Sequence, residues 1–228
     1  MSNHFKTIYT SQADLYDQLV TKEDMMYNVT NAMLTLRHVA NSEVIELGAG
    51  TGRLTRWFAN HAKKIVAFDL YQHMLEHLQS TLKKPVMLAV ADNRALPIPD
   101  ASSDMTVAGW SFGHAIGWYP DDWDVHIQQM LREMARITRP NGTMVVIETL
   151  GTGHSKPVPP SPEFVEYYDY LRNIGFLRRW VRSDYRFDTV EQAERLIRFF
   201  FGDELADHVR QNNMTVVPEC TGIWWKHV

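Results

Sequence analysis

Cysteine, long apolar runs and an excess of positive charge are all lacking in this sequence. The single cysteine, Cys220, excludes an intramolecular disulfide and a cysteine-rich metal site. No run approaches the roughly 20 apolar residues of a membrane-spanning helix, and the first six residues lack the apolar run of a signal peptide. The net charge is −4, with 23 Lys and Arg against 27 Asp and Glu. Because nucleic-acid binders usually carry a basic excess, we expect no nucleic-acid partner. The missing apolar runs predict a cytoplasmic protein with no membrane span.

A metal site is not expected either. No set of zinc ligands is apparent in the sequence. Asp121, Asp122 and Asp124 lie close enough together to suggest a cation site, but they also fit the first turn of a helix. Carboxylates at that end of a helix interact favourably with its dipole, so we interpret these acids as structural.

Strand-like and helix-like segments alternate between residues 40 and 150. Short apolar runs bounded by Gly, Asp or Pro predict strands, and apolar residues spaced three and four apart predict helices. This alternation is typical of crossovers that join parallel strands into a doubly wound α/β sheet. The expected strands are 44–47, 65–68, 86–90, 105–108 and 143–147, and the expected helices are 54–62, 74–82 and 127–137.

The flanking segments have a different pattern. Before this core, Ser11 with Asp14 three residues later resembles a capping box and predicts a leader helix, and a second helix is expected at 26–39. After it, the segment 151–162 is rich in Gly, Pro and Ser, and the rest of the chain is too short to bury a core of its own. We expect one domain over 1–228, with leader helices at 1–40, a core at 41–150 and a C-terminal part at 151–228. The C-terminal part is expected to contain a helix at 162–172, a strand at 176–187, a helical insert at 189–211 and a last strand at 214–225.

The most informative segment is Glu46-Leu47-Gly48-Ala49-Gly50-Thr51-Gly52, which joins the first strand to the next helix. Missing Cβ atoms let a ligand approach the backbone, and free N–H groups near a helix start can meet an anion. Nicotinamide-binding folds also use a glycine-rich turn, but their G-x-G-x-x-G/A pattern would place its third small residue at Arg53. The spacing therefore argues against a dinucleotide.

Acidic and amide residues come directly after the next two strands. Asp69 ends the second strand, where a carboxylate can accept hydrogen bonds from both hydroxyls of a ribose. Asp92 and Asn93 come after the third strand, where the edge of an adenine could lie. Two further signals precede the fourth and fifth strands: Leu96-Pro97-Ile98-Pro99-Asp100 with Ser103-Asp104, and Arg139-Pro140-Asn141-Gly142-Thr143.

With these motifs in this order, residues 40–150 resemble the class I S-adenosylmethionine (SAM)-dependent methyltransferases. The likeness is to the branch related to ubiquinone and menaquinone biosynthesis methyltransferases (methyltransferase type 11). It implies a Rossmann-like, mostly parallel seven-stranded sheet with an antiparallel last strand, SAM as cofactor and S-adenosylhomocysteine (SAH) as product. The residues that the resemblance places around SAM are Glu46, Gly48, Gly50 and Gly52 at the methionine part, Asp69 at the ribose, Leu70 and Met74 on the adenine, Asp92 and Asn93 at its edge, and Trp110 near the methionine end.

Candidate residues for the acceptor side lie where loops leave the fourth and fifth strands, at the expected ligand edge of an α/β sheet. His114, in the aromatic segment after the fourth strand, is the first candidate for a general base, and Glu148 and His154 are the next. Tyr9 and Tyr16, on the leader, are candidate lid residues. The aromatic segment favours a small, partly apolar molecule as the acceptor.

Two other functions compete with methyl transfer. A nicotinamide-dependent oxidoreductase is disfavoured by Arg53, and no tyrosine precedes a lysine by four positions, as short-chain dehydrogenases require. A non-catalytic module that binds SAM or SAH is compatible with every cofactor motif, and only the aromatic segment 110–119 favours an enzyme over it. His114 also fits a structural, hydrogen-bonded role, which the sequence favours over a base. Phe199, Phe200 and Phe201 of the insert fit either a cap over the acceptor or a core.

Overall fold

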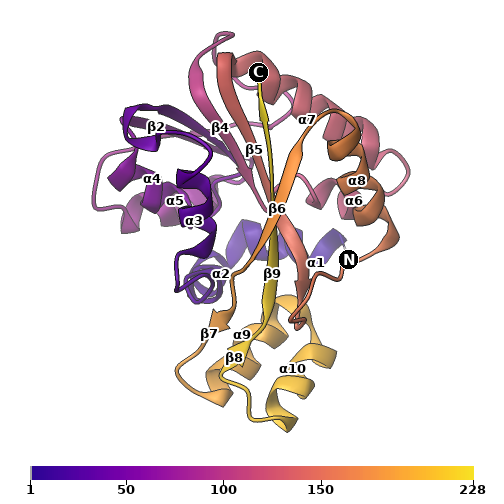
Figure 1. Cartoon of the computed structure of the whole chain (residues 1–228). Helices are drawn as coiled ribbons and strands as arrows, with labels where there is room; N and C mark the ends of the chain where they lie inside the picture. Colours follow the sequence, from indigo (N-terminus) through magenta and orange to yellow (C-terminus); the bar gives the residue numbers. More distant parts are fainter. Residues whose placement is uncertain (1) are drawn as a thin grey trace.

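A seven-stranded sheet forms the centre of the computed structural model, which describes residues 2–228 (Figure 1). The strand order is β3-β2-β1-β4-β5-β9-β6; β1 to β5 pair in parallel, and β9 runs antiparallel to both of its neighbours. The Rossmann-like sheet with an antiparallel last strand is thus confirmed. Its strands are β1 (Glu43–Leu47), β2 (Lys64–Asp69), β3 (Met87–Val90), β4 (Ser103–Gly109), β5 (Thr138–Thr152), β6 (Leu177–Arg182) and β9 (Glu219–His227).

Helices cover both faces of the sheet because its central strands are apolar on both sides. Val145 and Ile147 of β5 pack in one cluster with α3 and α4, and Val146 packs in the opposite cluster with α7 and α8. The predicted stripe of α7 is buried along its whole length. The helices of the first face are α3 (Asn28–Leu34), α4 (Thr55–His61) and α5 (Gln72–Thr81), and those of the second are α6 (His114–Trp118), α7 (Trp123–Ile137) and α8 (Pro162–Asn173).

The leader differs from its prediction. Ser11 ends helix α1 (Ser2–Ser11) instead of capping the next one, and its hydroxyl donates to the carbonyl of Thr7 at 2.9 Å. A serine that bonds back to the preceding turn cannot serve as an N-cap, so the predicted capping box is wrong. The next helix, α2 (Ala13–Val20), begins after a one-residue break. The helix expected at 26–39 is also shorter, because it ends at Leu34 and gives way to a turn and the 3-10 helix η1 (Val39–Asn41).

The C-terminal part departs from prediction at two strands. The strand expected at 176–187 is broken into β6 and β7 (Tyr185–Arg186), and the one expected at 214–225 is broken into β8 (Val216–Val217) and β9. Pro218, which has no N–H for a ladder, separates β8 from β9. The small β7–β8 pair lies below the main sheet with α9 (Val190–Phe201) and α10 (Asp203–Gln211) (Figure 1). These elements share an apolar cluster to which α2 contributes Leu19.

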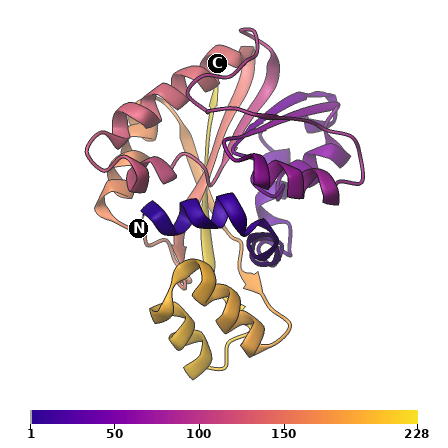
Figure 2. The ribbon, with the colours of Figure 1, turned by 180° about the vertical axis from the view of Figure 1, so that it is seen from behind.

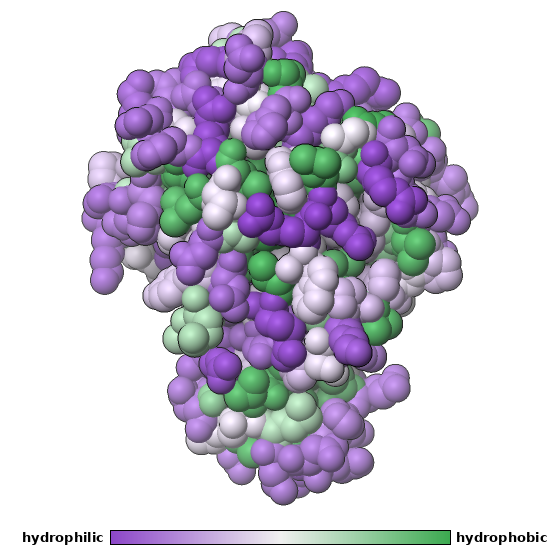
Figure 3. Space-filling model, in the orientation of Figure 1, coloured by the Kyte–Doolittle hydropathy of each residue, from purple (hydrophilic) through white to green (hydrophobic). Residues whose placement is uncertain are grey.

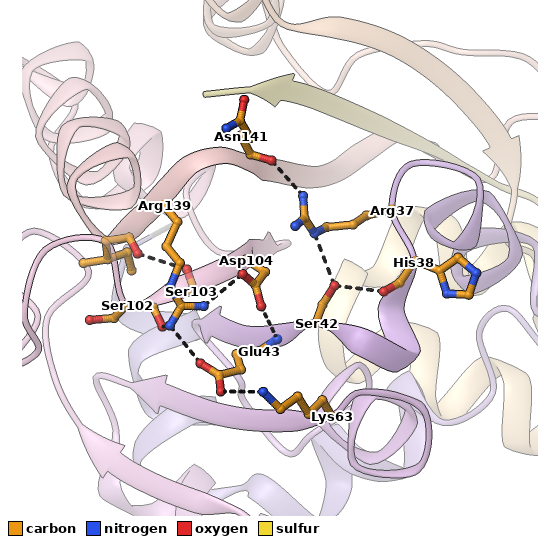
Figure 4. Close-up of polar contacts among 11 residues, drawn as sticks. Arg37, His38, Ser42, Glu43, Lys63, Ser102, Ser103, Asp104, Arg139 and Asn141 are labelled. Carbon is orange, nitrogen blue, oxygen red and sulfur yellow. Dashed lines mark hydrogen bonds and ion pairs between the residues drawn. The ribbon is translucent and has the colours of Figure 1, made fainter.

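A polar network ties together the amino-terminal ends of the strands (Figure 4). Arg139, at the start of β5, donates to Asp104 of β4 (2.9 Å) and to Glu43 of β1 (2.8 Å). Asp104 also accepts from the backbone N–H of Glu43 at 2.8 Å, and Arg37 donates to the carbonyl of Asn141 at 2.9 Å. Asp104 and Arg139, which belong to the two motifs noted around the starts of the fourth and fifth strands, therefore join neighbouring strands at their amino-terminal ends.

Most of the face shown in Figure 3 is hydrophilic, with small apolar areas between charged and polar residues. Within residues 2–228, no helix is both long enough and apolar enough to cross a bilayer. The same described residues contain no cluster of His, Cys, Asp or Glu arranged to hold a metal ion. Asp122 instead occupies the N-cap position of α7 and Asp124 its first turn.

Candidate functional site

A cavity lies at the carboxyl ends of β1, β2, β3 and β4. The space between its walls, with the open mouth included, is about 940 Å³. Its walls come from the turns after these strands, from α6 and α7, and from the leader helices α1 and α2. Figure 2 shows α1 crossing the molecule above the α9–α10 pair. The cavity therefore occupies the ligand edge predicted from the sequence.

The glycine turn forms one wall of the cavity. Gly48 and Gly50 line it, with positive φ angles of 77° and 55° that favour glycine. The N–H of Gly48 donates to the carbonyl of Phe68 at 2.8 Å, which fixes the turn against β2. A Cβ atom on Gly48 would lie 2.4 Å from that of Ser111, so the turn after β1 and the turn after β4 meet only because this residue is glycine.

Gly52 has a different place. It does not line the cavity, and a Cβ atom on it would lie 2.2 Å from Cδ1 of Leu78 in α5. With a φ of 96°, it lets the chain turn into α4 while α5 packs closely behind. The third glycine of the motif therefore supports the turn from outside the cavity.

Asp69 lies at the end of β2 with 7% of its surface exposed, bordering the cavity. Its Oδ2 accepts from the N–H of Gly50 at 2.7 Å, and its Oδ1 accepts from the N–H of Tyr71 at 2.8 Å. Burial raises the pKa of this carboxyl to about 6, while the backbone hydrogen bonds oppose the rise. A carboxylate has about four acceptor positions, so Asp69 retains acceptor capacity for a ligand. Leu70 and Met74 line the cavity beside it.

Glu46 and Trp110 lie at the other end of the glycine turn. Glu46 is 2% exposed, and its Oε2 accepts from the hydroxyl of Thr55 at 2.6 Å. Burial raises the pKa of Glu46 to about 8, so a cationic group that entered the cavity beside it would favour its ionised form. Trp110, directly after β4, also borders the cavity, and the guanidinium of Arg53 lies 3.3 Å from the centroid of its ring.

Asp92 and Asn93 both border the cavity, but their polar atoms are engaged differently. Asp92 is held by Arg94, whose Nε donates to its two oxygens at 2.9 and 3.0 Å, and this hydrogen bonding lowers the pKa of Asp92. The Oδ1 atom of Asn93 is buried and has no partner among the described residues. An unpartnered acceptor at a cavity wall fits a ligand that brings its own donor, such as the amino group of an adenine.

His114 begins α6 and is enclosed by aromatic rings. Its Nε2 lies 2.9 Å from the hydroxyl of Tyr9, which comes from α1, and its ring stacks on Trp118 at 5.1 Å. Burial lowers the pKa of His114 to about 4, so the imidazole is neutral near pH 7. Tyr9 and Tyr16 both line the cavity, in the position expected of lid residues. Phe200 packs on Tyr16 at 5.5 Å, which links the insert to this lid.

Glu148 and His154 do not line the cavity with His114. Glu148, 3% exposed, accepts from the N–H of Gly113 at 2.9 Å and so holds the start of α6 from behind. His154 lies on the loop after β5, where its carbonyl accepts from Sγ of Cys220 at 3.4 Å. Side chains alternate along a strand, and this alternation turns Glu148 toward the layer of α6 and α8.

Replacing Glu148 with glutamine is expected to stabilise the protein at alkaline pH. Burial raises the pKa of Glu148 to about 8, well above its value in an unfolded chain. Between about pH 4.5 and 8 the folded state then keeps a proton that the unfolded state has lost, so this group makes stability fall as pH rises. Urea unfolding measures the free energy of unfolding of both proteins at pH 5.5 and pH 8. The difference between E148Q and the wild type should be more favourable to E148Q at pH 8 than at pH 5.5, by about 1 kcal/mol or more, the scale of one pKa unit. An equal difference at both pH values would show that Glu148 ionises normally.

Among the cavity residues that received no binding role from the sequence, three have basic side chains. Arg53 was considered only as the residue that breaks the dinucleotide pattern, although its place directly after the glycine turn is a signal for a cavity position. Arg94 lies two residues after Asp92, a spacing that allows the clamp seen here. His126 comes from α7 and binds Nη1 of Arg94 at 2.8 Å, and no short-range pattern predicts that contact.

The fold and the cavity define a Rossmann-like protein with a candidate ligand site at the carboxyl ends of its strands. Residues 45–146 match the family model described as a methyltransferase domain. An uncharacterized methyltransferase of Schizosaccharomyces pombe is 34% identical over 107 residues, which cover 46% of this chain and 38% of that protein. A malonyl-[acyl-carrier protein] O-methyltransferase of Pseudescherichia vulneris is 30% identical over 141 residues, which cover 62% and 51%.

Among solved structures, a SAM-dependent methyltransferase from Aquifex aeolicus superposes with a TM-score of 0.56 at 15% identity, covering 88% of this chain and 90% of that one. At this identity the likeness establishes the fold alone. The chain spans about 40 to 50% of the length of the two curated relatives. The family model, the relatives and the fold together support a methyltransferase domain of the class I SAM-dependent type over residues 45–146.

Proposed function

We propose that this chain transfers a methyl group from SAM to a small, partly apolar acceptor. The observation that carries the proposal is the composition of the cavity. Its strand-side wall presents glycines, Asp69 and the unpartnered oxygen of Asn93, whereas its outer wall is aromatic. The aromatic residues that border it are Tyr9, Tyr16, Tyr71, Trp110, Trp118 and Tyr119.

The residues of the strand-side wall are assigned by this proposal to the cofactor. Glu46, Gly48 and Gly50 surround its methionine part with Trp110, and Asp69 accepts from the ribose hydroxyls. On the adenine side, the apolar residues Leu70 and Met74 pack on the ring and Asn93 accepts from its amino group. Because Asp92 is already hydrogen-bonded to Arg94, we expect it to contribute less than Asn93 to the binding of the adenine.

SAM supplies an activated methyl group on a sulfonium, so the protein has little covalent chemistry to perform. Its residues align the acceptor, a contribution of about 7–11 kcal/mol in favourable cases, and keep water out of the cavity. Tyr9 and Tyr16 serve the second purpose as parts of a lid formed by α1 and α2. His114, neutral and buried at the lid, is assigned the role of base toward the acceptor, and we place the reaction in the cytoplasm.

Calorimetry and a turnover screen test this function. We expect SAM and SAH to bind with Kd values of about 1 to 10 μM, about −7 to −8 kcal/mol, and NAD to bind far more weakly. A library of small metabolites, screened for release of SAH, should then contain an acceptor. Tight NAD binding without SAM binding would overturn the assignment. SAM binding without turnover of any library member would favour a non-catalytic SAM-binding module.

A further inference from the structure

Arg53 is a cation at the acceptor end of the cavity. It comes directly after the glycine turn, and its guanidinium lies against the face of Trp110, 3.3 Å from the ring centroid. Tyr16 and Val20 of α2 also line the cavity, and Tyr16 interacts electrostatically with Arg53. The other arginine of the lining, Arg94, is bound to Asp92 on the adenine side. Arg53 is therefore the cation of the lining placed between the methionine part and the lid.

The hydrogen-bonding capacity of Arg53 is only partly used. Its Nη1 donates to the carboxylate of Glu23, which is 1% exposed and also accepts from the hydroxyl of Ser183 at 3.0 Å. A guanidinium has five N–H donors in a planar fork. Among the described residues no second acceptor is bonded to Arg53, which borders the cavity.

The charges around Arg53 leave room for an anion. Glu23 balances Arg53, and burial beside Glu23 raises the pKa of Glu219 to about 8, which keeps that carboxyl largely neutral at pH 7. Bound SAM brings a net charge of about +1, from a sulfonium, an ammonium and a carboxylate. Ionised Asp69 can balance that charge, so the case for an anion rests on Arg53 itself, which borders the cavity and has one bonded acceptor among the described residues.

We propose that Arg53 binds a carboxylate of the acceptor, so that the substrates are small carboxylic acids with an apolar body. The carboxylate takes the free side of the guanidinium, and the apolar body lies against Trp110, Tyr16 and Val20. This inference rests on the proposed function and deepens it. Carboxylates suit the guanidinium fork because two parallel N–H···O bonds can form, and such charge-assisted bonds are roughly twice as strong as neutral ones.

Glu23 is the internal competitor of such an acceptor, because its carboxylate holds Nη1. Glutamine at position 23 keeps the size and one acceptor oxygen but removes the charge. Binding of an anion to Arg53 should then become stronger, whereas a purely structural ion pair would leave the affinity for an acceptor unchanged. Removing the charge of Arg53 should weaken the binding of an anion, and removing the charge of Glu23 should strengthen it. The assignment can therefore be tested without a known substrate.

The experiment measures binding of matched probes to the SAH-loaded protein by calorimetry. Benzoate, phenylacetate and 3-phenylpropanoate are compared with benzamide, phenylacetamide and 3-phenylpropanamide, which keep the shape and lack the charge. In the wild type we expect the acids to bind about tenfold more tightly than the amides, the low end for hydrogen bonds to charged groups. E23Q should strengthen acid binding about severalfold further and leave amide binding unchanged.

The double variant R53Q/E23Q removes both charges together, which avoids a buried unpaired carboxylate. We expect it to bind acids and amides alike, with the Kd of SAH and the melting temperature close to those of E23Q. Equal affinity of acids and amides in a wild type that binds SAH would overturn the carboxylate proposal and leave the proposed function intact. Loss of SAH affinity in R53Q/E23Q would also overturn it, because Arg53 would then serve the carboxylate of the cofactor. Failure of the wild type to bind SAH or SAM would instead refute the proposed function.

Discussion

Replacing Asp69 with alanine is expected to raise the Kd of SAM by about 10- to 100-fold, or about 1.5–3 kcal/mol, the scale of hydrogen bonds to a charged group. The carboxylate is buried at the cavity wall, and each of its oxygens already accepts one backbone N–H. Its remaining lone pairs are the acceptors proposed for the ribose. Alanine removes these acceptors and also releases the N–H of Gly50, so the glycine turn loses a fixed point at the same time.

Calorimetry with SAM measures this effect, and D69N is the matched control. Asparagine keeps one oxygen and the shape, so it should lose less affinity than alanine. The pKa of Asp69 is raised to about 6, and the ionised form is the better acceptor. SAM binding by the wild type should therefore weaken as pH falls from 7 to 5, while binding by D69N stays nearly flat. A D69A protein that melts like the wild type and binds SAM equally well would show that Asp69 has no contact with the ribose.

The sheet was predictable because its information is local. Each central strand is a short apolar run, such as Val44 to Leu47, and each ends at a glycine or an acid. Glycine turns and acids at strand ends gather at one edge whenever the strands are parallel, so the order of motifs predicted the cavity as well. Gly48, Asp69 and Asn93 come from three separate turns, yet the parallel register brings all three to one wall.

The remaining features depend on contacts between distant segments. At the break between β6 and β7, Ser183 donates to the carbonyl of Glu219 and the side chain of Asp184 accepts from the N–H of Glu219, and no local pattern encodes these contacts with a distant segment. The clamp of Arg94 on Asp92 is local in sequence, but it leaves Asn93 as the unpartnered acceptor, and that outcome depends on burial. Glu148 was expected at the end of the fifth strand, but β5 continues to Thr152. Its side chain faces α6, where it accepts from the N–H of Gly113.

Replacing His114 with alanine is expected to lower turnover of the true acceptor by about 10²- to 10⁴-fold, the usual contribution of a general base. The Kd of SAM should change little, because His114 lies on the lid side and its Nε2 faces the hydroxyl of Tyr9. The pKa of His114 is lowered to about 4, so its ring is unprotonated throughout the neutral range. Wild-type turnover should therefore be insensitive to this group between pH 6 and pH 8.

Y9F and H114N separate a chemical role from packing. Phenylalanine at position 9 removes the hydroxyl that now occupies Nε2, and it keeps the ring that packs against His114. If His114 acts on the acceptor, Y9F should retain most of the turnover while H114N and H114A lose it. If the Tyr9–His114 contact only closes the lid, Y9F and H114N should raise the KM of the acceptor by similar factors and leave kcat alone. A folded H114A with full turnover would show that the acceptor needs no base at this position. An acceptor carboxylate that is already ionised at neutral pH would behave in this way.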